Sequence, residues 1–161
     1  MLQCGDEMSE NNCNFKCKGV DCPNHCCEAY NGCEQMLRPL ENMSFSEIIL
    51  IPEDVKHLVD AGYKHLICTN REGLPILHTA QDGTCMALKD GRCSIYDTRP
   101  TICRAYPLYL DLFVGVGVLK ECKAVSDNLK LHDFKEGFSS LLEIYEFWIH
   151  YYKNKIFNEE G

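Results

Sequence analysis

The spacing of the cysteines constrains this chain more than any other feature of its sequence. Six of the twelve cysteines lie between residues 13 and 33, and four more follow at Cys85, Cys93, Cys103 and Cys122. A chain of 161 residues with 45% hydrophobic residues can bury a core without cross-links. The cysteines therefore need a chemical explanation beyond stabilising a small fold.

The first residues of the chain indicate the cellular compartment, and so the redox environment, of these thiols. Residues 1–7 are polar and acidic, whereas a secretory signal starts with basic and then apolar residues. We therefore expect a cytoplasmic protein whose thiols stay reduced, so metal ligation is favoured over disulfides. The longest apolar run, residues 106–119, is broken by Pro107 and Asp111, so no membrane contact is expected.

The charge balance disfavours nucleic acid as a partner. Sixteen basic residues stand against 24 acidic ones, a net charge of −8, and no basic stripe is visible. The sequence contains no P-loop, nucleophile motif or complete GxGxxG, so catalytic residues are unknown and it stays open whether the protein is an enzyme. The expected partner is an unidentified protein or small molecule.

The cysteine spacing also excludes several common metal motifs. No C-x2-C pair occurs, which rules out zinc knuckles and rubredoxin-like pairs, and no H-x3–5-H pair occurs for a zinc finger. Adjacent Cys26 and Cys27 are awkward ligands for one tetrahedral ion, because successive side chains diverge in a helix and oppose each other in a strand. The pair favours two sites, or two metals of one cluster.

Two segments carry a more specific pattern. The first is Phe15-x-Cys17-x4-Cys22-x3-Cys26-Cys27, and the second, residues 85–107, has the pattern C-x2-L-x2-G-x-C-x-I-Y-x2-R-P-x2-C-R-x-Y-P. Together they resemble the YkgJ-type cysteine-cluster family, whose members are described as zinc- or iron-chelating proteins. The resemblance covers about residues 13–122.

The resemblance implies a set of eight metal ligands. Cys13 is the alternative to Cys17 as the first of them, and the resemblance assigns no role to Cys4, Cys33 and Cys68. His25, which lies inside the first block, is a further candidate. The eight implied ligands are Cys17, Cys22, Cys26, Cys27, Cys85, Cys93, Cys103 and Cys122.

The number of ligands suits more than one metal centre. Four thiolates satisfy either Zn²⁺ or a [4Fe–4S] cluster, so eight cysteines suit two such sites. A similar cysteine cluster occurs in flagellin lysine N-methylases, which are regarded as iron–sulfur enzymes, and this resemblance favours iron–sulfur. We expect one or two centres with a redox or modification role. The alternatives are a zinc module that stabilises an interaction surface and a metal-handling protein without catalysis.

Other residues near the cysteines have two interpretations. Arg99 and Arg104 flank Cys103, and both guanidinium groups can offset thiolate charge as structural residues. The alternative is that one of them binds an anionic group of a cofactor, substrate or partner. Cys68 lies in an apolar, strand-like context and is expected to be a small core residue.

The expected fold class is α+β, with an irregular cysteine-rich metal-binding shell on a small sheet and a long C-terminal helix. The expected organisation is a flexible N-terminus at 1–12, a metal-binding domain at 13–125 and an amphipathic helix at 126–161. Strands are predicted at 46–51, 64–69, 74–79 and 109–119, and a short helix at 52–62.

The C-terminal helix carries an apolar stripe at helical spacing, from Leu131 to Ile156. We expect this stripe to face the core, and the alternative is a face that binds a partner.

Overall fold

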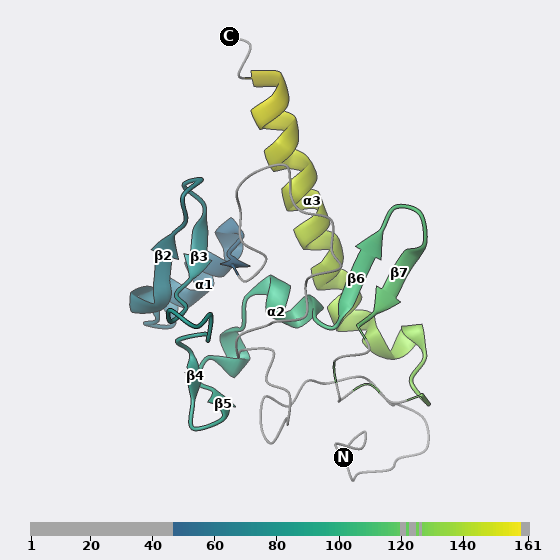
Figure 1. Cartoon of the computed structure of the whole chain (residues 1–161), viewed down its shortest axis with the longest axis horizontal. Coiled ribbons are helices and arrows are strands. Elements are labelled where there is room, and N and C mark those ends of the chain that lie inside the picture. The colour runs from purple at the N-terminus through teal and green to yellow at the C-terminus, as the bar shows by residue number, and fades with distance from the viewer. Residues whose placement is uncertain (1–46, 120–121, 123–124, 126, 159–161) are drawn as a thin grey trace.

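The computed structural model describes residues 47–119, 122, 125 and 127–158. The predicted flexible segment 1–12, the candidate ligand His25 and the first four predicted ligands lie outside these residues. The described part is α+β, as the sequence predicts, with small antiparallel sheets, short helices and one long C-terminal helix (Figure 1).

The first elements form a three-stranded sheet with one helix beside it. The strand order is β1-β3-β2, with both neighbours antiparallel to the central β3. The hairpin predicted between 64–69 and 74–79 is confirmed, although residues 64–66 form a 3₁₀ turn. The bounds are β1 (Ile48–Ile49), α1 (Pro52–Asp60), the turn η2 (Lys64–Leu66), β2 (Ile67–Thr69) and β3 (Pro75–Leu77).

The apolar residues of these elements build the first core. Leu50, Leu58 and Leu77 are fully or almost fully buried in one cluster. Helix α1 begins at Pro52 because proline fits the first helical position, where no N–H is needed, as the sequence predicts.

A connecting region leads from this core to a second one. It contains two two-residue strands, a 3₁₀ turn and a helix of five residues. The second core gathers around Ala105, Leu108, Phe134 and Leu141. The bounds are β4 (Leu88–Lys89), β5 (Arg92–Cys93), the turn η3 (Tyr96–Thr98) and α2 (Thr101–Ala105).

The segment predicted as a single strand at 109–119 is instead a hairpin of β6 (Leu108–Asp111) and β7 (Gly115–Val118). The Asp111 carboxylate accepts hydrogen bonds from the N–H groups of Phe113 and Val114 at 2.7 and 2.9 Å. Gly115 has a φ of 88°, which suits glycine, so the chain reverses here. The three apolar side chains at the tip are at least 78% exposed.

The predicted C-terminal helix is confirmed as α3 (Lys135–Asn158), which follows the 3₁₀ turn η4 (Leu131–Phe134). Its first half packs on α2 and β6, while its far end extends away from the β6–β7 hairpin (Figure 1). Across the described residues, no helix combines the length and the apolar character that crossing a bilayer requires.

The buried face of α3 differs from the predicted apolar stripe. Ser140, Leu141 and Ile144 are buried, whereas Phe138 and Ile149 of the stripe are exposed. At about 100° per residue, the buried face is rotated by roughly 90° from the centre of the stripe. The prediction that the stripe faces the core is therefore only partly right.

Small residues explain this rotation. A β-carbon on Gly137 would lie 3.3 Å from the carbonyl oxygen of Arg104 and 3.4 Å from a methyl of Leu108. Gly137 and the buried Ser140 thus let α2 approach α3 closely. The packing of α3 is set by which side chains are small as much as by which are apolar.

Candidate metal centre

Four of the eight predicted ligands lie in the described part of the chain. Cys85 is 3% exposed and forms an isolated β-bridge with Thr79. Cys93 is half-buried in β5, Cys103 is half-buried in α2, and Cys122 is 5% exposed in the connection between β7 and η4. None of the four is a fully exposed thiol.

The structure brings two of these cysteines to one place. Cys85 belongs to the first core cluster and Cys93 packs against the same cluster. Within the described ranges, no group of three or more His, Cys, Asp or Glu side chains is arranged to hold a metal ion. Cys85, Cys93, Cys103 and Cys122 therefore do not make a complete site by themselves.

The chemistry of these donors fits the metals that the resemblance implies. Thiolates are soft ligands that suit zinc and iron–sulfur clusters and exclude Ca²⁺ and Mg²⁺. The remaining four predicted ligands lie outside the described residues. The set of eight predicted ligands therefore stays a prediction.

Cys68 lies outside the predicted ligand set, and its surroundings raise its pKa. It lies in β2 opposite Ile76 and is half-buried. Burial raises the pKa of the Cys68 thiol, and the nearby negative charge of Glu47 raises it further. A raised pKa favours the protonated thiol of Cys68 in the metal-free protein. Cys68 is half-buried rather than part of the buried core, so the expectation of a core residue is met only in part.

Helix α2, which carries Cys103, is fixed by a buried carboxylate of α1. Asp54 Oδ1 accepts hydrogen bonds from the Thr101 N–H at 2.8 Å and from the Thr101 hydroxyl at 2.7 Å. Asp54 is 2% exposed and Thr101 is fully buried. The contact joins residues 47 positions apart and ties the first helix to the cysteine-bearing one.

Both arginines that flank Cys103 have partners inside the chain. The Arg104 guanidinium donates to the Arg99 carbonyl and to the Thr101 hydroxyl, each at 2.8 Å. Arg99 Nε donates to the Tyr96 carbonyl at 2.9 Å, and its guanidinium carbon lies 3.8 Å from the centre of the Tyr96 ring. These contacts support the structural interpretation of both residues, while binding of an anionic cofactor group stays a prediction.

Sequence reasoning missed Asp54 and Thr101. The acidic first turn of α1 predicts that Asp54 stabilises its own helix, and its Oδ2 does accept the Ile51 N–H at 3.2 Å. The bond to Thr101 has no local signal, because the two residues meet only through the tertiary fold. In the sequence, only the position of Thr101 as a small polar residue directly after Arg99-Pro100 points to such a contact.

Comparison with known families gives a match to residues 16–135. This range encloses all eight predicted ligands and excludes Cys4 and Cys13. The chain separates Cys17, Cys22 and the Cys26-Cys27 pair by four and three residues, more than the two and two of the family's label. Comparison with curated proteins and with solved structures gives no match. Since the match covers well over half of the chain, the protein belongs to the CxxCxxCC family, described as a putative zinc- or iron-chelating domain.

Proposed function

We propose that this protein binds iron through cysteines from both halves of the chain, in one or two iron–sulfur centres with a redox or modification role. The proposed ligands are Cys17, Cys22, Cys26, Cys27, Cys85, Cys93, Cys103 and Cys122. The observation that carries the proposal is the family match, whose range encloses all eight. The low exposure of Cys85 and Cys122 adds support, because buried positions protect a cluster from solvent.

Two further observations favour a functional iron–sulfur centre over a structural zinc ion. The described part of the chain builds two hydrophobic clusters of its own, whereas a structural zinc commonly supplies the folding energy that a small core lacks. Adjacent Cys26 and Cys27 suit separate metals better than one ion. Zinc in a non-catalytic interaction module is the second candidate, because the family description names both metals.

Anaerobic purification from iron-replete cells tests the proposal. We expect a brown protein with broad cysteine-to-iron absorption and, for two four-iron clusters, about eight iron and eight sulfide per chain. A colourless protein that carries zinc under the same conditions would overturn the iron–sulfur assignment and leave the zinc module. A protein without either metal would overturn metal binding altogether.

Single cysteine variants locate the ligands. Cys103→Ser is expected to lower the iron and sulfide content. Cys68→Ser is the matched control, since Cys68 is also half-buried but lies outside the proposed set, and it is expected to keep both. Equal metal content in both variants would remove Cys103 from the ligand set.

Variants of the adjacent pair test whether there are two centres. Cys26→Ser and Cys27→Ser are each expected to remove a different part of the metal, because each thiolate serves its own centre. If both changes abolish the same absorption bands and the same iron equivalents, a single centre replaces the two-centre arrangement.

A further inference from the structure

Helix α2 cannot hold its own position. It spans five residues, and helices this short are unstable without tertiary contacts. The residue before it is Pro100, and no side chain at that position caps its first turn. Because Cys103 lies in the middle of α2, the location of its thiol depends on contacts from outside the helix.

Besides the packing of α3 on α2, Asp54 supplies polar contacts from α1. Its Oδ1 accepts both the N–H of Thr101, the first residue of α2, and the Thr101 hydroxyl. Its Oδ2 accepts the N–H of Ile51 and so closes the first turn of α1. One buried carboxylate therefore satisfies the starts of two helices and sets the distance between them.

Thr101 extends the connection along α2. Its hydroxyl donates to Asp54 and accepts from the Arg104 guanidinium, so both of its hydrogen-bonding roles are filled. Arg104 also donates to the carbonyl of Arg99, just before the helix. The residues on both sides of Cys103 are thus fixed, while its own N–H donates to the Pro100 carbonyl at 2.9 Å.

We propose that Asp54 is a positioning residue for the metal centre, which through Thr101 fixes where α2 presents the Cys103 thiol. The inference rests on the proposed function, which makes Cys103 a ligand. Metal sites require ligands in a narrow geometry, and residues that orient ligands influence metal affinity by about 10- to 100-fold. Asp54 acts on the position of Cys103 without contacting the metal.

The test uses anaerobic titration of the full-length apoprotein with Co²⁺, whose visible bands report the number and geometry of bound thiolates. Asp54→Asn replaces one carboxylate oxygen with an amide N–H₂ group, which cannot accept the hydrogen bond that this oxygen accepts. Thr101→Val keeps the shape of the side chain and removes the hydroxyl, whereas Thr101→Ser keeps the hydroxyl. We expect the first two variants to bind Co²⁺ at least about 10-fold more weakly with altered bands, and Thr101→Ser to resemble the wild type.

A stability control separates positioning from general loosening of the fold. Ile76→Ala leaves a cavity beside the buried Ile76 position of β3, which makes none of the hydrogen bonds that hold α2, and is expected to lower the melting temperature without changing the cobalt bands. If Asp54→Asn does not fold, the comparison of cobalt affinity and bands between Thr101→Val and Thr101→Ser tests the proposal. The proposal is overturned if Thr101→Val and Thr101→Ser both give wild-type cobalt bands and affinity. It is also overturned if Ile76→Ala changes the bands as much as Thr101→Val does.

Cys103→Ser distinguishes this proposal from the one on which it rests. Loss of thiolate bands in Cys103→Ser, together with wild-type bands in Asp54→Asn and Thr101→Val, overturns the positioning role alone. Wild-type bands in Cys103→Ser show that Cys103 is not a ligand, and then both the ligand set and the positioning role fall.

Discussion

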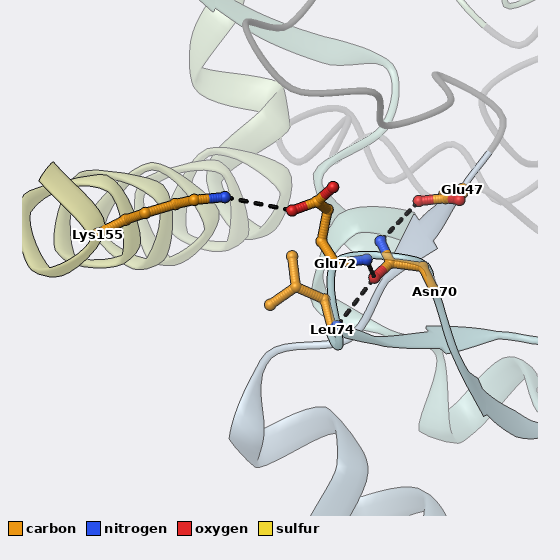
Figure 2. Close-up of polar contacts among 5 residues, drawn as sticks. All are labelled: Glu47, Asn70, Glu72, Leu74 and Lys155. Carbon is orange, nitrogen blue, oxygen red and sulfur yellow. Dashed lines mark hydrogen bonds and ion pairs between the residues drawn. The ribbon is translucent and has the colours of Figure 1, made fainter. Parts of the chain in front are cut away.

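Lys155 Nζ lies 3.2 Å from Glu72 Oε2, so a residue near the end of α3 is bonded to the turn between β2 and β3 (Figure 2). The two side chains are 22% and 24% exposed, whereas the pair formed by Lys56 and Asp60 on α1 is 74% and 62% exposed. The less exposed pair is screened less by water and salt. It holds the far half of α3 against the first sheet.

This difference predicts unequal coupling energies. A double-mutant cycle with Glu72→Gln and Lys155→Met is expected to give about 1 kcal/mol, and the cycle with Asp60→Asn and Lys56→Met a clearly smaller value, because solvent screens the exposed pair. Urea denaturation at low and high salt measures both. Equal couplings would show that the Lys155–Glu72 contact does not hold α3 in solution.

Asn70 stabilises the same turn from within. Its Oδ1 accepts the N–H groups of Glu72 at 3.0 Å and Leu74 at 2.9 Å, and its Nδ2 donates to Glu47 Oε2 at 2.8 Å (Figure 2). Asn70→Ala removes all three bonds and is expected to lower the free energy of unfolding by about 2 kcal/mol. Arg71→Ala, at the exposed neighbouring position, should change it by less than about 0.5 kcal/mol. Similar losses in both variants would contradict this role of Asn70.

Gly117 leaves room for an aromatic ring on the hairpin. Tyr109 pairs with Gly117 across β6 and β7, and a β-carbon on Gly117 would lie only 2.7 Å from a ring carbon of Tyr109. Gly117→Ala must displace the ring and is expected to destabilise the protein by about 1 kcal/mol. In a Tyr109→Ala background the same change should cost much less, as thermal denaturation can measure. An equal cost in both backgrounds would place the strain elsewhere.

The raised pKa of Cys68 predicts its reactivity with pH. The thiolate is the reactive form, so at a given pH a raised pKa lowers the alkylation rate of Cys68 relative to that of the unfolded chain. The rate should therefore rise only at higher pH in the folded protein, as peptide mapping after iodoacetamide treatment can measure. Glu47→Gln removes the smaller cause and should shift the profile partway to lower pH. A folded profile that matches the unfolded one would contradict the burial of this thiol.

Features with local causes could be predicted from the sequence. Helix α1 begins at Pro52, and Gly73 in the turn has a φ of 80°. Both structures could be predicted, because proline fits the first position of a helix and glycine adopts a positive φ readily. The long helix α3 follows from the spacing of its apolar residues. Prediction failed where a local signal was hidden, as between Asp111 and Gly115, whose intervening apolar residues resemble the interior of a strand.

Features that depend on distant partners could not be predicted. The inward face of α3 follows from Gly137 and Ser140, whose small size matters only because α2 packs there. The candidate ligands Cys85, Cys93, Cys103 and Cys122 come from a sequence pattern, and that pattern contains no information on how Asp54 anchors the helix of Cys103.

The hydrogen bond between Asp54 and Thr101 also orders the folding of this chain. Its partners are 47 residues apart, so a long loop must close before the bond can form, and this loss of chain entropy precedes any gain. Helix α1 is synthesised first, so the Asp54 carboxylate precedes the five residues of α2 that it contacts in the folded protein. A newly made chain therefore places the Cys103 thiol in its final position only after this closure, and under the proposed function the incorporation of metal at that thiol would follow it.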